Sequence, residues 1–177
     1  MKPTKEVYPL DISLCHEVQI HYKRPLYDET RIIRSSQSAQ SIFRDFIDTE
    51  RLDYKEFFLV MLLTNANQVL AISEISVGVT TGTLVNTKEI LQLAFLTNAS
   101  GVLLCHNHPS GTLKKSTTDE IITKRIKQAL GLLDMKLLDH IILTTESYVS
   151  FTDKGWLDPS EKTCLNSKPQ SHITEGS

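Results

Sequence analysis

Apolar and polar positions repeat with two different periods along this chain, one typical of strands and one typical of helices. Residues 17–23 alternate strictly between apolar and polar side chains, which predicts a half-buried edge strand. Residues 56–63, EFFLVMLL, are apolar almost throughout, which predicts a central strand covered on both faces. A second strand over residues 68–77 follows a short turn-forming segment, so we expect these two strands to form a hairpin.

Other segments repeat their apolar residues at helical spacing. The first helix is expected to begin at Ser35 or Ser36 and to run to about Asp48. Two more helices are predicted over residues 87–98 and 116–133. The remaining strands are short and apolar, and are predicted over residues 101–106, 136–143 and 148–151. The expected fold class is therefore α/β, with a mixed β-sheet and flanking helices.

Length and composition indicate one globular domain. Of the 177 residues, 40% are hydrophobic and 23% are charged, which is ordinary for a folded chain. We divide the sequence into a leader with an edge strand (1–34), a domain (35–157) and a polar tail (158–177). We expect this tail to be disordered, because it lacks apolar residues for a core.

Three further features narrow the class of protein. The net charge of −2 argues against a strongly basic nucleic-acid binder, although a local basic patch stays possible. The longest apolar run, Phe57–Leu63, is far shorter than the roughly 20 residues of a membrane-spanning helix, so we expect no membrane partner. Cysteines at 15, 105 and 164 show no paired spacing, which favours reduced thiols and a cytoplasmic location.

The stretch CHNHPSGTLKKSTTD, residues 105–119, holds the candidate chemistry. His106 and His108 are two residues apart, so in extended backbone both imidazoles point to the same side. Asp119 lies in the first turn of the helix that Ser116 opens, where the helix dipole favours an ionised carboxylate. Two histidines and one carboxylate would give a tetrahedral zinc ion three ligands and leave its fourth position open, as in catalytic sites.

A catalytic zinc site also needs a carboxylate that moves protons. The candidates are Glu56, Glu74 and Glu89. Position favours Glu56, because it is the first residue of the most apolar strand. Two structural alternatives stay open. Ser116 and Asp119 also fit a helix-capping box that needs no metal, and Glu56 could be a solvated acid at a strand end.

Neighbouring residues have expected roles as well. Cys105 should face away from His106 and form a buried thiol. His140 should share its strand face with Leu138 and Ile142, where a core histidine or a partner that orients a ligand is favoured over a metal ligand. Asp139 should point the other way, and its role is open.

The pattern H-x-H, seven residues, Ser, two residues and Asp resembles the JAMM motif of JAB/MPN metalloproteases. From Glu56 to about Trp156 the sequence is similar to the RadC-like branch of that family, with its HNHPSG core. Thr87 and Lys88 differ from the Pro-Arg pair usual in that branch. The resemblance implies a cytidine-deaminase-like α/β architecture.

The resemblance also implies a site. One Zn²⁺ per chain would be held by His106, His108 and Asp119. Glu56 would act as general base and acid, and the Ser116 hydroxyl would help to stabilise the tetrahedral oxyanion.

The implied activity is metal-assisted hydrolysis of a peptide or isopeptide bond in a protein or peptide substrate. Two other functions compete with it: a DNA-repair-associated accessory protein that binds nucleic acid, and a metal-stabilised scaffold without turnover. The sequence leaves the oligomeric state undetermined.

Overall fold

The computed structural model describes residues 31–47, 49–78 and 85–157. The predicted strand at 17–23 and the predicted tail at 158–177 lie outside these residues. The α/β class is confirmed: a five-stranded mixed sheet has the order β2-β1-β3-β4-β5. In chain order the elements are α1 (Ser36–Phe46), the 3₁₀-helix η2 (Thr49–Arg51), β1 (Glu56–Leu63), β2 (Val69–Gly78), α2 (Thr87–Leu96), β3 (Gly101–Asn107), α3 (Thr117–Gly131), β4 (Lys136–Leu143) and β5 (Tyr148–Ser150).

Strand pairing follows from how the strands are connected. β1 pairs antiparallel with β2, as the predicted hairpin requires, and antiparallel with β3 on its other side. β3 and β4 are parallel, and α3 supplies the crossover that a parallel pair needs. β5 adds a short antiparallel edge. β1 therefore lies inside the sheet, which explains its apolar sequence.

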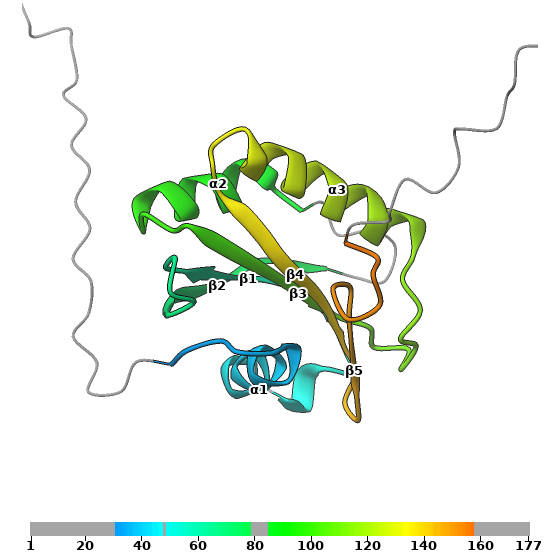
Figure 1. The fold of residues 1–177 in the computed structure, drawn as a ribbon. Coiled ribbons are helices and arrows are strands. Elements are labelled where there is room, and N and C mark those ends of the chain that lie inside the picture. The colour runs from blue at the N-terminus through cyan, green and yellow to red at the C-terminus, as the bar shows by residue number, and fades with distance from the viewer. Residues whose placement is uncertain (1–30, 48, 79–84, 158–177) are drawn as a thin grey trace, which may run out of the picture.

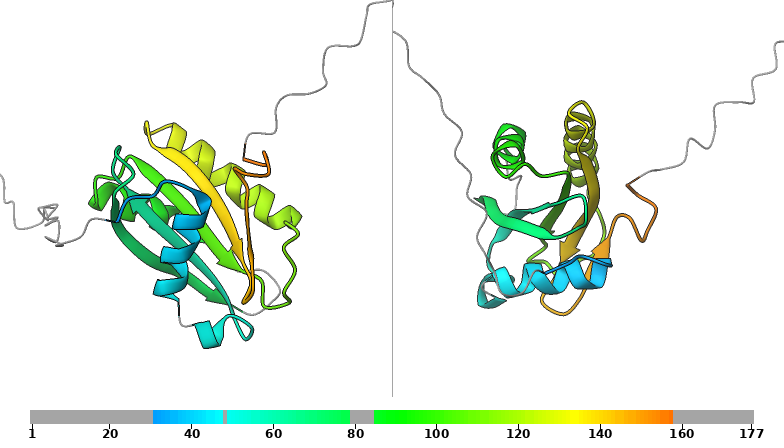
Figure 2. Two further views of the ribbon diagram at one scale, coloured as in Figure 1. Left: turned by 60° about the horizontal axis from the view of Figure 1, so that its bottom comes forward. Right: turned by 60° about the vertical axis from the view of Figure 1, so that its left-hand side comes forward.

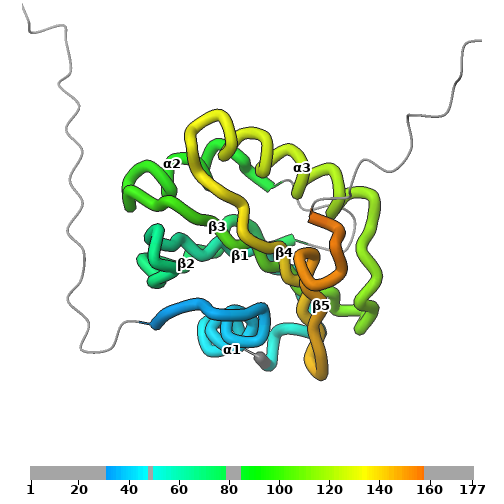
Figure 3. The backbone as a smooth tube through the Cα atoms, in the orientation of Figure 1, coloured from blue at the N-terminus to red at the C-terminus, as the bar shows by residue number. Residues whose placement is uncertain are grey.

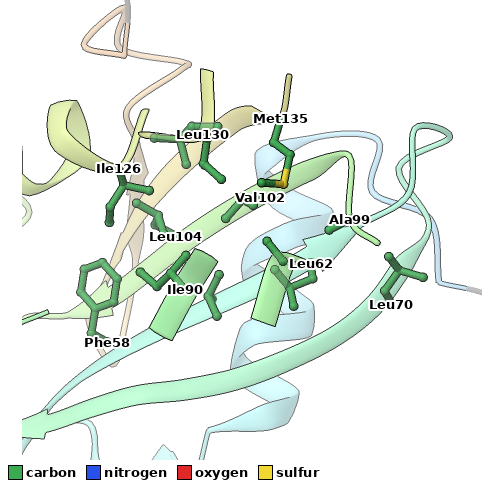
Figure 4. Close-up of a cluster of buried hydrophobic side chains, with 13 residues drawn as sticks. Phe58, Leu62, Leu70, Ile90, Ala99, Val102, Leu104, Ile126, Leu130 and Met135 are labelled. Carbon is green, nitrogen blue, oxygen red and sulfur yellow. The ribbon is translucent and has the colours of Figure 1, made fainter. Parts of the chain in front are cut away.

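Helices cover both faces of the sheet, with α1 on one face and α2 and α3 on the other (Figures 1 and 2). Alternate side chains of each strand thus enter two different cores. Figure 4 shows the core under α2 and α3, where Phe58, Leu104 and Ile126 come from three elements. Cys105 belongs to the core on the α1 face, as expected of a buried thiol. Among the described residues, no helix is both long and apolar enough to cross a membrane.

An irregularity in β4 overturns one expectation. The register between β3 and β4 shifts so that Val102 pairs with Leu137 but Leu103 pairs with Asp139. The extra residue, Leu138, packs against the core on the α1 face. The prediction that His140 shares a face with Leu138 is therefore wrong, because strict alternation fails at this bulge.

Three chain segments meet at one end of the sheet, where β1 begins and β3 ends. Because β1 and β3 are antiparallel, the start of β1 lies beside the end of β3, and Phe58 is paired with His106. The loop from β3 to α3 then passes beside the chain that follows β5 (Figure 3), where the ammonium of Lys115 lies 4.8 Å from the ring centroid of Trp156. The candidate residues of β1, β3 and α3 are thereby gathered at this end of the sheet.

Candidate metal centre

The three residues proposed as metal ligands converge. His106 Nε2 lies 3.0 Å from His108 Nε2 and 3.3 Å from an oxygen of Asp119. His108 Nε2 lies 3.7 Å from the other oxygen of the same carboxylate. His106 and Asp119 are both buried, with 2% and 8% of their surface exposed. One potential ligand atom from each side chain therefore faces a common point.

The second nitrogen of His108 has a backbone partner. Its Nδ1 lies 2.8 Å from the carbonyl oxygen of Thr112. A carbonyl can only accept a hydrogen bond, so Nδ1 carries the proton in a neutral ring and Nε2 keeps its lone pair. This hydrogen bond selects the tautomer that a metal ligand needs.

Asp119 is held by the start of α3. Ser116 is the N-cap, and its hydroxyl accepts a hydrogen bond of 3.1 Å from the Asp119 N–H. In return, the Ser116 N–H donates to Asp119 Oδ2 at 2.6 Å. Burial alone would raise the pKa of Asp119, but the neighbouring His106 ring and the Ser116 hydrogen bonds hold this pKa well below its usual range. The capping box is thus present, and it orients an ionised carboxylate.

This donor set fits a divalent metal such as zinc. Two imidazole nitrogens and a carboxylate are usual zinc ligands, and bonds of about 2.0–2.1 Å in a tetrahedron place neighbouring ligand atoms about 3.3 Å apart. At this site the two nitrogens lie 3.0 Å apart, and they lie 3.3 and 3.7 Å from the two oxygens of Asp119. One ligand atom from each of the three residues lies within 4.8 Å of the others. When both Nε2 atoms carry lone pairs, a cation would also offset the repulsion between these lone pairs, which lie beside the negative carboxylate of Asp119. The chain therefore has a possible His106-His108-Asp119 metal-binding group.

A pocket of about 620 Å³ opens over this group, and both Glu56 and Ser116 line it. Glu56 stands two residues before Phe58, whose pairing partner is His106, so Glu56 lies on the same sheet face as the histidines. Of the other two candidate acids, neither lines the pocket. Glu74 pairs with Leu59 of the opposite core, and Glu89 lies in the first turn of α2.

Asn107, which lies between the two histidines, was not expected to have a role. Its side-chain oxygen accepts from the Phe57 N–H at 2.7 Å, and its amide donates to the carbonyls of Leu52 and Lys55, both at 2.7 Å. These bonds fasten the chain on either side of Glu56 to the end of β3. No local sequence signal reveals this, because the partners lie about 50 residues away.

His140 and Thr123 form a second set of contacts behind the histidines. His140 Nε2 lies 2.8 Å from His106 Nδ1, and His140 Nδ1 lies 2.6 Å from Thr123 Oγ1. Complete burial, and then the charge of His106, lower the pKa of His140 well below its ordinary value. This contact with His106 is the one expected of a partner that orients a ligand. Thr123 could have been noticed, since it follows Asp119 by four residues on one helix face.

Asp139 has a structural set of partners. It accepts from the Ser150 hydroxyl at 2.5 Å and from the backbone N–H groups of His140 and Thr152. Burial raises its pKa against the effect of these hydrogen bonds. Asp139 therefore connects β4 to β5 and to the turn that follows.

A mixed sheet with a His-His-Asp group at the end of an inner strand, and an acid on the neighbouring strand, is consistent with a domain of the JAB/MPN class. The family model described as the RadC-like JAB domain matches residues 33–156. The chain belongs to this family.

Curated relatives agree with this assignment. A UPF0758 protein of Flavobacterium johnsoniae is 42% identical over 123 residues, which are 70% of this chain and 52% of that protein. A UPF0758 protein of Cellvibrio japonicus is 36% identical over 121 residues, or 68% of this chain and 54% of that protein. The chain thus spans about half the length of these relatives, and their names state no activity.

Proposed function

We propose that this protein is a zinc-dependent hydrolase that cleaves an amide bond, of the peptide or isopeptide kind. The observation that carries the proposal is the gathering of one metal-binding group, one acid and one hydroxyl around a single pocket. When bound by His106, His108 and Asp119, zinc would lower the pKa of a coordinated water and polarise the carbonyl under attack.

Glu56 is the residue proposed to move the proton. It lies at the pocket edge on the same sheet face as the histidines, and it is partly buried. Its carboxylate would accept a proton from the attacking water and then pass it to the departing amine. Of the three acids considered from the sequence, only Glu56 lines the pocket.

Ser116 is proposed to stabilise the negative charge that develops on the carbonyl oxygen. Its hydroxyl oxygen accepts from the Asp119 N–H, which leaves the hydroxyl proton available to donate. A donor fixed at a helix N-cap needs little reorganisation during the reaction, which is how such groups assist acyl transfer. Capping and oxyanion stabilisation therefore use different parts of the same side chain.

The pocket walls indicate how a substrate would sit. Phe58, Val85 and Ile122 supply apolar surface, and Lys114 and Arg125 supply positive charge at the rim. A peptide segment with both apolar and acidic character would match these walls. We therefore propose a protein or peptide as the partner.

The metal is tested first. The untagged 177-residue chain, purified without added metal, should contain close to one zinc ion per chain by elemental mass spectrometry. The variant His106→Ala should lose it, because two remaining ligands bind weakly. If wild-type protein takes up no zinc even when the ion is offered to the folded chain, the proposal fails.

Activity is tested second, on a mixture of peptides and branched isopeptides analysed by mass spectrometry. Glu56→Gln should keep the zinc and lose about 10²- to 10⁴-fold in turnover, because it removes the proton acceptor. Glu74→Gln is the matched control, since Glu74 is exposed and lies outside the pocket. Undiminished cleavage by Glu56→Gln would exclude Glu56 from the mechanism.

A further inference from the structure

We propose that Thr123 and His140 are positioning residues, which fix the tautomer of His106 so that its Nε2 lone pair faces the metal. The two residues would act as a relay that starts at a backbone carbonyl and ends at a metal ligand. This inference rests on the metal site of the proposed function, but not on the reaction proposed there.

The relay is a continuous chain of short hydrogen bonds. Thr123 Oγ1 donates to the carbonyl oxygen of Asp119 at 2.5 Å. The same Oγ1 lies 2.6 Å from His140 Nδ1. At the far side of the ring, His140 Nε2 lies 2.8 Å from His106 Nδ1. His106 then faces His108 and Asp119 through Nε2.

The direction of each hydrogen bond follows from the first. The Asp119 carbonyl can only accept, so the single hydroxyl proton of Thr123 is directed to it. Oγ1 must then accept from His140, which places the proton of a neutral His140 ring on Nδ1. His140 Nε2 is left as an acceptor, so His106 Nδ1 donates to it. The His106 Nε2 lone pair is therefore directed at the metal-binding group.

Water cannot substitute for a member of this relay. His140 is completely buried, and Thr123 and His106 have 4% and 2% of their surface exposed. Phe58 stacks on His106 with an interplanar angle of 8°, and Phe151 lies against His140 with ring centroids 4.7 Å apart. The rings are thus held in place by packing, and the hydrogen bonds decide which nitrogen carries the proton.

The mechanism resembles the way in which the Thr112 carbonyl fixes His108. The two histidines differ in how they reach a carbonyl. His108 contacts its carbonyl directly, whereas His106 is connected to one through two side chains. A partner of this kind generally changes metal affinity about 10- to 100-fold when it is removed. We expect that range for loss of the Thr123 hydroxyl.

The first measurement is the Zn²⁺ affinity of the 177-residue chain, by competition with a chromogenic chelator. Thr123→Val keeps the shape but lacks the hydroxyl, and should bind Zn²⁺ about 10- to 100-fold more weakly. Thr123→Ser restores the hydroxyl and should restore the affinity. Thr97→Val is the matched control. Thr97 is also buried, and as the C-cap of α2 it donates to carbonyls three and four residues earlier. It precedes the start of β3, whereas His106 lies at the other end of that strand.

The second measurement detects the tautomer itself. Long-range ¹H–¹⁵N NMR spectra of the zinc-free wild-type protein should show His106 with a protonated Nδ1 and a bare Nε2. In Thr123→Val the His106 signals should move toward a mixture of tautomers, and a merely structural role would not produce this change. The wild-type spectrum alone decides the matter if Thr123→Val does not fold.

The outcomes separate the two proposals. A wild-type His106 protonated on Nε2, or a folded Thr123→Val that matches wild type in both measurements, overturns the relay. Wild-type protein that binds no Zn²⁺ overturns the proposed function, whereas the NMR spectrum still tests the relay. Zinc binding that weakens in Thr123→Val, without hydrolysis by the wild-type protein, supports the relay and refutes the catalytic proposal.

Discussion

Asn107 offers the sharpest test of how the fold places Glu56. This side chain is fully buried at the end of β3 and uses both its oxygen and its amide nitrogen. Its three partners lie in the segment from Leu52 to Phe57, which contains Glu56. Replacement of Asn107 by alanine would therefore release the beginning of β1 from β3.

The magnitude follows from the burial of each bond. The Phe57 N–H and the Leu52 carbonyl meet Asn107 in buried surroundings, whereas the Lys55 carbonyl is in a part-buried bond that water can replace. A buried polar group that loses its partner destabilises a protein by about 1–3 kcal/mol. Two such groups, partly relieved by water entering the space, give an expected loss of about 3 kcal/mol for Asn107→Ala.

The assay is equilibrium unfolding in urea, with Asn65→Ala as the control because Asn65 is exposed. Asn107→Asp should be destabilised at least as much as Asn107→Ala, since it keeps the acceptor for Phe57 but turns a carboxylate toward two carbonyl oxygens. Zinc content should fall less than turnover, because the Asn107 hydrogen bonds hold the segment that contains Glu56 and not the metal ligands. A loss of stability below about 1 kcal/mol in Asn107→Ala would refute this reasoning.

Three other predictions test single features. Burial, and then the charge of His106, lower the pKa of His140. Below about pH 6.5 the unfolded chain therefore takes up a proton at His140 that the folded chain does not. The free energy of unfolding should then fall by up to about 1.4 kcal/mol for each unit by which the pH is lowered. His140→Gln should show a shallower dependence in urea unfolding from pH 7 to 5, and equal slopes would contradict the assignment. Burial raises the pKa of the Cys105 thiol. In a variant with Cys15→Ser and Cys164→Ser, Cys105 should therefore react with a disulfide reagent only when the protein unfolds. A prompt reaction of the native protein would show that the thiol is accessible. The Arg44 guanidinium donates to three carbonyls of the β4–β5 turn; Arg44→Lys should lose about 1–2 kcal/mol in thermal or urea unfolding, and unchanged stability would show that these bonds contribute nothing.

The elements were predictable because their signals are local. β1 is apolar after Glu56 because β2 and β3 flank it and helices cover both faces, and α3 begins where Ser116 supplies a cap. The grouping of His106 and His108 follows from strand alternation, and that of Asp119 from the length of the intervening loop. These inferences need only the neighbouring residues.

The remaining features depend on contacts distant in sequence. The bulge at Leu138 reverses the faces of β4 and arises from the register with β3, so alternation alone places Leu138 on the wrong face. The Asn107 hydrogen bonds reach residues about 50 positions away in the sequence, and the relay joins helix α3 to strand β4. Periodicity identifies which face a residue occupies, but it does not identify the partner that meets it there.

Asp119 shows why the capping and metal-binding interpretations need not compete. The capping box engages Oδ2 through the Ser116 N–H, whereas Oδ1 faces His106 Nε2. The Asp119 backbone carbonyl is meanwhile the acceptor at the start of the relay through Thr123. One residue at the start of α3 therefore fixes its own carboxylate through the cap and, through the relay we propose, the protonation of the histidine opposite. The helix N-terminus also favours the negative charge that this arrangement requires. A structural cap at this position is the means by which a metal ligand becomes preorganised.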